Sequence, residues 1–142
     1  MYLFNSMSDI SLLLEKNIYI HEKNEYGHLV IVLKDLIGIK TNKTNVELII
    51  NKIVEQVEKS LEISEKYGKK RGFVHVYFND CSIASAPISL FKKLNKVLAN
   101  RFEDTVEEIF IYTNSKIVTK LWNIIKFIVD PETREKIQIV MS

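Results

Sequence analysis

Short apolar runs alternate with amphipathic segments through most of this sequence, and that order restricts the folds open to the chain. Runs rich in β-branched and aromatic residues occupy 17–21, 28–34, 73–78, 107–113 and 136–141. The polar segment 22–27 joins the first two and ends in glycine, which indicates a hairpin. Helix-like segments separate the other runs, and strands joined through helices pair in parallel. We therefore predict an α/β fold with a mixed, mostly parallel five-stranded sheet and helices on both faces.

The longest helix is predicted from one apolar stripe. Its members recur at the i, i+3, i+4, i+7 spacing and are Val46, Ile49, Ile50, Ile53, Val54, Val57 and Leu61. Thr44 and Asn45 offer capping oxygens before it, and Gly68 lies just past its end. A short helix is predicted after Ser8, and a second amphipathic helix over about 88–98 has Pro87 in its first turn.

Composition excludes several classes of protein. The 142 residues carry a net charge of only +2, which is too small to indicate a nucleic-acid partner. Cys81 is the single cysteine, so no disulfide forms within the chain and we expect a cytoplasmic protein. The first residues lack the pattern of a secretory signal. The most apolar run, 122–129, contains Lys126 and falls far short of the roughly 20 residues that a bilayer span needs.

The predicted helix at 116–128 is unusually apolar. Its apolar residues cover more than half of the circumference and are Ile117, Val118, Leu121, Trp122, Ile124, Ile125, Phe127 and Ile128. A surface helix normally has an apolar stripe of about 100° or a little more. One face can pack on the sheet, and the other requires a ligand, a membrane surface, another chain or a neighbouring segment to cover it.

Two stretches near the C-terminus resemble a known family. Tyr112-Thr113-Asn114-Ser115 reads as a strand ending in a short Asn-containing turn. Residues 121–137 follow the pattern Lys-x-Phe-Leu-Asp-x-x-Thr-x-x-Lys-Ile, with matches at Lys126, Asp130, Thr133, Lys136 and Ile137. Upstream, 27–33, 54–61 and 74–80 resemble an early strand, the first long helix and a strand ending in Asp. From Ile18 to the C-terminus the sequence therefore resembles the CRAL-TRIO family.

The resemblance implies an α/β core that holds a lipid between its sheet and a mobile helix, without a cofactor and without chemical conversion. By position on strands and helices, the candidate apolar lining residues are Phe78, Leu90, Phe91, Leu94, Ile111, Leu121, Trp122 and Ile125. Family members that bind phosphatidylinositol use a Glu and a Lys at positions matched here by Asp104 and Lys136. A lysine solvated beside a strand is the simpler interpretation of Lys136. Residues 1–142 are expected to form a single domain lacking the family's usual N-terminal helical lobe and C-terminal extension.

The expected partner is a lipid or other hydrophobic small molecule, with transient contact to a membrane surface. The alternative is a protein-interaction scaffold, bound to another protein or to a second copy, because residues 87–94 also resemble the divergent BCH-type branch of the family. An enzyme is not expected: His75 and Asp80 lie too far apart along a strand to activate Cys81. The three histidines, His21, His28 and His75, lack the spacing of metal ligands.

Overall fold

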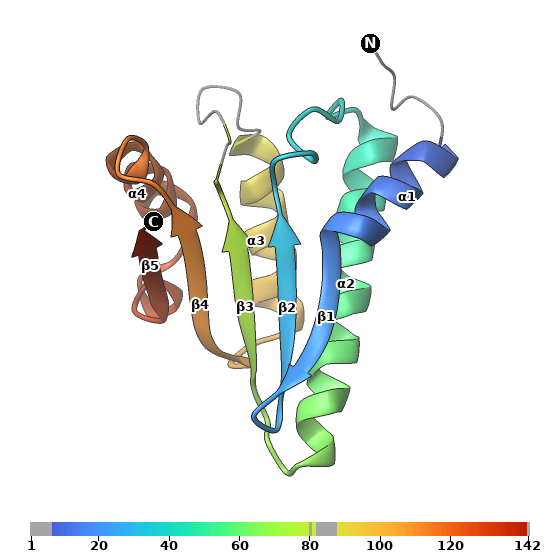
Figure 1. The fold of residues 1–142 in the computed structure, drawn as a ribbon, viewed down its shortest axis with the longest axis vertical. Coiled ribbons are helices and arrows are strands. Elements are labelled where there is room, and N and C mark those ends of the chain that lie inside the picture. Colours follow the sequence, from blue (N-terminus) through green and yellow to red (C-terminus); the bar gives the residue numbers. More distant parts are fainter. Residues whose placement is uncertain (1–6, 80, 82–87, 142) are drawn as a thin grey trace.

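The computed structural model describes residues 7–79, 81 and 88–141, which form five helices and one five-stranded sheet (Figure 1). The elements are α1 (Met7–Asn17), β1 (Ile18–Lys23), β2 (Tyr26–Val32), α2 (Lys43–Lys66), β3 (Gly72–Tyr77), α3 (Ile88–Arg101), β4 (Val106–Thr113), α4 (Val118–Ile128), α5 (Pro131–Arg134) and β5 (Ile137–Met141). The strands lie in the order β1-β2-β3-β4-β5. Only β1 and β2 are antiparallel, and the other three pairs are parallel. The predicted mixed, mostly parallel sheet is confirmed.

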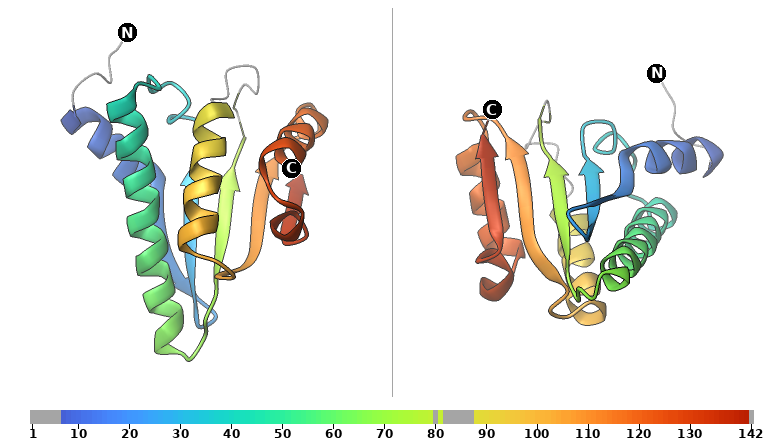
Figure 2. Two further views of the ribbon diagram at one scale, coloured as in Figure 1. Left: turned by 180° about the vertical axis from the view of Figure 1, so that it is seen from behind. Right: turned by 60° about the horizontal axis from the view of Figure 1, so that its bottom comes forward.

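The helices of the described chain lie on one face of this sheet, so the prediction of helices on both faces is wrong. α2, α3 and α4 lie behind the strands in Figure 1 and in front of them in the left view of Figure 2, which is seen from behind. The reason is the strand order, which follows the sequence without reversal. Each parallel crossover is right-handed, and right-handed crossovers that advance in one direction place every helix on the same side. Helices on both faces require the order to reverse at a switch point.

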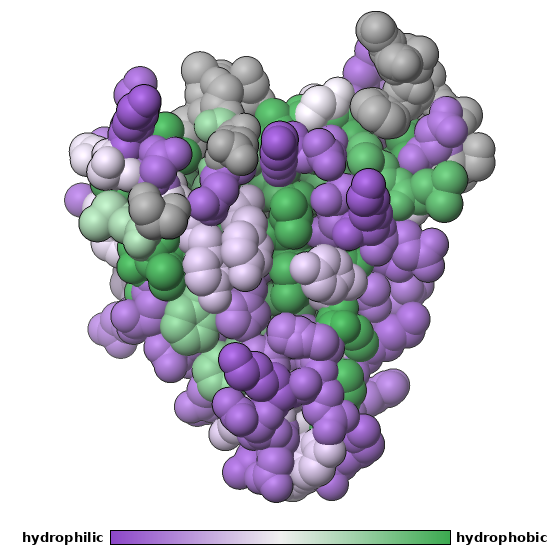
Figure 3. Space-filling model, viewed as in Figure 1, coloured by the Kyte–Doolittle hydropathy of each residue, from purple (hydrophilic) through white to green (hydrophobic). Residues whose placement is uncertain are grey.

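Aromatic side chains cover the opposite face of the sheet. The rings come from β1 to β4 and stack across neighbouring strands: His21, His28, Phe73, His75, Tyr77, Phe110 and Tyr112. Tyr77 and Tyr112 are cross-strand partners whose ring centroids lie 4.2 Å apart. In Figure 3, which views this face, pale and green residues gather over the middle of the sheet between purple borders. The rings shield the strand backbone where no described helix does.

The hairpin is tighter than the sequence indicated. Lys23 pairs with Tyr26, so Asn24 and Glu25 form a two-residue turn, and both have positive φ (54° and 70°), as a type I′ turn requires. The glycine therefore lies inside β2 and not in the turn. A Cβ on Gly27 would lie 1.8 Å from the carbonyl oxygen of Ser60 in α2. The glycine is needed because helix and strand approach so closely there.

The long helix α2 begins at a different cap from the one predicted. The side chain of Asn42 caps it and accepts a hydrogen bond of 2.9 Å from the backbone N–H of Asn45. Thr44 and Asn45 lie inside the first turn. The helix ends as predicted, with Gly68 in the left-handed conformation (φ 74°) just after it. The predicted first-turn Pro87 of α3 lies outside the described residues.

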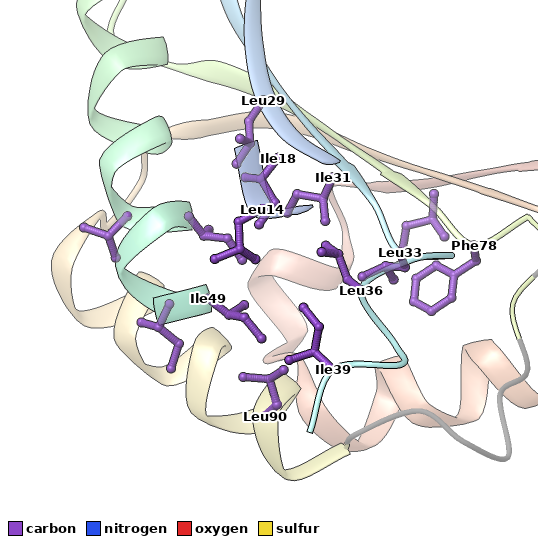
Figure 4. Packing of buried hydrophobic residues seen from close by; sticks show 14 of the residues in the cluster. Leu14, Ile18, Leu29, Ile31, Leu33, Leu36, Ile39, Ile49, Phe78 and Leu90 are labelled. Carbon is purple, nitrogen blue, oxygen red and sulfur yellow. The ribbon is translucent and has the colours of Figure 1, made fainter. Parts of the chain in front are cut away.

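The tightest packing lies at the α1–α2 side of the molecule. Figure 4 shows side chains from α1, β1, β2 and α2 pointing toward one another, with Leu36 and Ile39 of the loop between β2 and α2 among them. α2 contributes eight buried residues, whereas α3 contributes only Leu90 and α4 only Leu121 and Ile125. Along its length α2 follows β1 and β2 closely, while α3 and α4 make few close approaches to any strand. The α3–α4 half of the helix layer therefore stands off the sheet.

Candidate functional site

An apolar cavity of about 230 Å³ lies between the sheet and helices α3 and α4. Val74, Val76 and Ile109 lie on the central strands and face the helix layer, yet all three remain partly exposed. Aliphatic side chains on the covered face of a sheet are normally buried. Here they are not, because the helices opposite them stand too far away to close the gap.

A larger cleft of about 510 Å³ continues the cavity toward the amino ends of β3 and β4. The two spaces share seven lining residues: Ile31, Ile53, Val74, Asn95, Leu98, Ile109 and Thr133. The polar residues that line the cleft but not the cavity form the polar end of the site and are Ser60, Asn100, Glu103, Asp104, Thr105, Asp130, Glu132 and Lys136. The site is thus amphipathic along its length. The larger space alone lies within the 300–1,000 Å³ range of small-molecule sites.

Most residues predicted to line an apolar site do line this cavity. Seven of the eight are in its wall: Phe78, Leu90, Phe91, Leu94, Ile111, Leu121 and Ile125. Trp122 is not, and it is 36% exposed on the outer side of α4. One residue advances about 100° around a helix, so the residue after the inward-facing Leu121 turns toward solvent. Sequence reasoning missed β3 residues Val74 and Val76, although the alternation along β3 places them on the same face as Phe78.

The helix α4 has one apolar face, so the prediction of two apolar faces is wrong. Its inward residues are buried or half-buried and contact the cavity: Leu121, Ile124, Ile125 and Ile128. Its outward residues are Thr119, Lys120, Trp122, Asn123, Lys126 and Phe127. Trp122 and Phe127 lie at the two borders of that outward face. They widen the apolar stripe, and for this reason the sequence pattern covers more than half of the helix circumference.

The predicted headgroup residues lie together at the polar end. Lys136 Nζ is 3.5 Å from Asp104 Oδ1, and the same oxygen accepts a hydrogen bond of 2.8 Å from Arg71 Nη2. The Arg71 guanidinium, helped by Lys136, lowers the pKa of the Asp104 carboxyl. Asp104 also has a positive φ of 55°. The single Asp104 carboxylate is therefore shared by two cations, Arg71 and Lys136.

Comparisons with known proteins identify the family to which this chain belongs. The sequence matches the CRAL/TRIO domain family over residues 14–142. The chain belongs to the CRAL/TRIO family. This family comprises lipid-binding and lipid-transfer proteins. Among solved structures, the crystal structure of Sfh5 aligns with 90% of this CRAL/TRIO chain at a TM-score of 0.78 and 13% identity. The aligned region is 50% of the Sfh5 chain. No curated protein matches. None of the described helices has the length and apolarity to cross a membrane.

The three histidines of this CRAL/TRIO domain meet on the aromatic face, away from the cavity. His28 Nδ1 and His75 Nε2 are 2.9 Å apart, and His75 Nδ1 is 2.8 Å from the Tyr112 hydroxyl. His28 Nε2 lies 3.2 Å from the carbonyl oxygen of Lys23, which can only accept. The neutral tautomers follow: His28 donates from Nε2, His75 donates from Nε2 to His28, and Tyr112 donates to His75.

Burial and neighbouring charge favour the neutral form of His28 and His75. Desolvation lowers the pKa of His75 to about 4, with a smaller contribution from His28. Desolvation also lowers the pKa of His28. Within the described residues, no three His, Cys, Asp or Glu side chains are placed to hold a metal ion. The stacked rings direct their nitrogens along parallel planes instead of toward one point.

His75 and Cys81, the two described members of the candidate catalytic set, do not lie together in the structure. Cys81 packs against the hydrophobic core on the helix side, whereas His75 hydrogen-bonds on the aromatic face. The sheet therefore separates the thiol from the imidazole. Asp80, the third member of the set, lies outside the described residues.

Proposed function

We propose that this CRAL/TRIO domain binds a lipid or other hydrophobic small molecule in the cavity and presents or transfers it without chemical conversion. The observation that carries the proposal is the partial exposure of Val74, Val76 and Ile109 on the covered face of the sheet. An apolar chain that fills the gap gains about 0.8 kcal/mol for each methylene removed from water. The domain itself is also stabilised, because its own aliphatic side chains become buried when the ligand binds.

The charges at the polar end favour a neutral or zwitterionic headgroup. The cleft lining includes four carboxylates, Glu103, Asp104, Asp130 and Glu132, and one cation, Lys136. Arg71, which is paired with Asp104, adds only a second positive charge beside them. Asp130 already accepts from the backbone N–H and hydroxyl of Thr133. A multiply phosphorylated headgroup would meet net negative charge there, whereas hydroxyl or ammonium groups would find acceptors. With Cys81 as its single cysteine, the chain has no need of an oxidising compartment, which supports action in the cytoplasm.

A cavity-filling variant tests the proposal. Val76→Phe adds a ring to the cavity wall, and Val32→Phe adds the same ring on β2 toward the aromatic face. We expect wild-type protein and Val32→Phe to bind a nitrobenzoxadiazole-labelled phospholipid with equal affinity. Val76→Phe should bind it at least about tenfold more weakly, which corresponds to 1.4 kcal/mol.

Native mass spectrometry of protein purified from cells gives the independent measurement. A mass increment that disappears in Val76→Phe supports the cavity as the site. Equal labelled-lipid affinity for the two phenylalanine variants would place the ligand elsewhere. If the wild-type protein binds none of a panel of neutral, zwitterionic and anionic lipids, the proposal fails.

A protein-interaction scaffold is the second candidate, and the aromatic face favours it. Tyr77, Tyr112 and Phe110 lie at the centre of a sheet face that no described helix covers. A partner protein or a second copy would bury those rings. If the domain is such a scaffold, light scattering should show a dimer or cross-linking should recover a partner. Tyr77→Lys should then abolish that association. A monomer that captures no partner contradicts it, whatever the outcome of the lipid assay.

A further inference from the structure

The two ends of the apolar cavity differ in burial. At the carboxyl ends of β3 and β4 its wall consists of side chains that are at most 8% exposed: Leu33, Leu36, Phe78, Leu90, Ile111 and Leu121. Toward the amino ends of the same strands the wall residues are partly exposed: Val74, Leu98, Ile109, Ile128 and Ile137. The cavity is therefore closed at the carboxyl end and opens into the cleft at the amino end. The deepest part of a ligand would meet the ring of Phe78.

The cavity is about as wide as one hydrocarbon chain. Its wall extends along β3 from Phe78 to Val74, which is a length of roughly 13 Å at the rise of a β-strand. Distributed over that length, the 230 Å³ give a cross-section of about 18 Å². One extended alkyl chain fills such a cross-section, and two chains side by side would need twice as much. At about 30 Å³ per methylene, close to the volume of a water molecule in the liquid, the cavity holds about eight methylenes.

The cleft leaves room for a headgroup but not for a second chain as well. Cavity and cleft together hold fewer than about 25 groups of methylene size. Two acyl chains that each reach the midplane of a bilayer contain about that many carbon atoms before any headgroup is added. A second chain in the cleft would also lie against the carboxylates of the polar end and remove them from water without pairing them.

We propose that the ligand is a single-chain amphiphile, with its tail in the cavity against Phe78 and its neutral or zwitterionic head at the polar end. The inference deepens the proposed function and rests on it. Hydroxyl or ammonium groups of the head meet carboxylates that outnumber the neighbouring cations. A two-chain phospholipid can bury only one of its chains in this cavity, so its second chain contributes little to affinity.

Soluble short-chain phosphatidylcholines test how many chains are buried. The probes carry either one or two octanoyl chains, and each displaces the labelled phospholipid below the concentration at which it forms micelles. Each buried methylene raises the affinity about fourfold, so a second buried octanoyl chain would raise it by a factor on the order of a thousand or more. We expect the one-chain and the two-chain lipid to bind within about tenfold of each other.

Lysophosphatidylcholines of increasing chain length test the closed end. Affinity for the wild-type protein should rise about fourfold per methylene and level off at about eight to twelve carbons, when the cavity is full. Phe78→Ala removes the ring at the closed end and should move this limit by about three methylenes toward longer chains. Phe78→Leu makes a smaller opening at the same place and replaces it if circular dichroism shows that Phe78→Ala does not fold. The matched control is Phe127→Ala, on a side chain that is 68% exposed and lines neither space, and it should keep the wild-type limit.

The outcomes separate this inference from the proposed function. A two-chain lipid that binds more than about tenfold more tightly than its one-chain counterpart overturns the single-chain ligand and leaves the proposed function standing. A chain-length limit that is the same in wild-type protein and in a folded Phe78 variant overturns Phe78 as the end of the tail site. If the wild-type protein binds neither the labelled phospholipid nor any lysophosphatidylcholine, the proposed function and this inference fail together.

Discussion

Replacing Gly27 with alanine tests how closely α2 approaches the sheet. The new Cβ would lie 1.8 Å from the carbonyl oxygen and 2.5 Å from the carbonyl carbon of Ser60. These are backbone atoms, so no rotamer change can relieve the contact. Ordinary van der Waals contact needs more than 3 Å, and α2 would have to move away from β2 by more than an ångström. The same movement would stretch the hydrogen bond of 2.8 Å from the Gly27 N–H to Ser64 Oγ.

The expected cost follows from these two effects. Overpacking in a close-packed interior costs about 1–3 kcal/mol, and a buried N–H that loses its acceptor adds about 1–3 kcal/mol. We therefore expect Gly27→Ala to lower the free energy of unfolding by about 2–6 kcal/mol. A domain of this size is stable by about 5–15 kcal/mol, so the variant should fold but unfold at a clearly lower temperature. At about 3 °C per kcal/mol, the melting temperature should fall by about 6–18 °C.

Thermal unfolding followed by circular dichroism, with urea titration for the free energy, measures this difference. Gly38→Ala is the matched control, because a Cβ at Gly38 would meet nothing within 4 Å and its φ lies outside the left-handed region. That variant should stay within about 0.5 kcal/mol of the wild-type protein or be slightly more stable. Equal melting temperatures for the two alanine variants would refute the close helix–strand contact.

Two further changes in stability are expected. The pKa of His75 is lowered to about 4 from its ordinary 6.5, so stability is complete above pH 6.5 and is lost as the pH falls from 6.5 toward 4. At 1.36 kcal/mol per pH unit the full difference is about 3 kcal/mol, and we expect about half because solvent screens a partly exposed ring. Urea midpoints at pH 7.5 and 4.5 measure the loss, which should shrink in His75→Phe; an equal loss in that variant contradicts the assignment. Asn42→Ala removes the N-cap of α2 and should cost about 1 kcal/mol, whereas the first-turn variant Thr44→Ala should cost less; the reverse order would contradict the observed cap.

The elements of the fold could be predicted because their signals are local. The apolar stripe from Val46 to Leu61 and the glycine at 68 define α2 without reference to any other segment. The side on which the helices lie could not be predicted in the same way. It depends on the strand order, and the order is fixed by pairs such as Val30 with His75, which are far apart in sequence. Alternation alone is compatible with either arrangement.

Helix and strand periodicity determine which way a side chain points, and to that extent the residues that line the cavity could be predicted. Leu121 and Ile125 are one turn apart and share a face, whereas Trp122 follows Leu121 directly and is turned by about 100° toward solvent. The histidine cluster was missed for another reason. His28 and His75 are 47 residues apart, and they meet only through the register of β2 with β3. Spacing along the chain carries no information about such a contact.

One physical difference between the helices explains why the site lies where it does. α2 lies close to the sheet because Gly27 and Gly72 present no side chain beneath Ser60. α3 and α4 face β3 and β4, whose inward residues are Val74, Val76, Ile109 and Ile111. These branched side chains, together with Phe91 and Leu94 opposite them, hold the two helices away from the strands without filling the space between. The same right-handed winding therefore gives a close-packed half around α2 and an open apolar half under α3 and α4, and only the open half has room for a ligand.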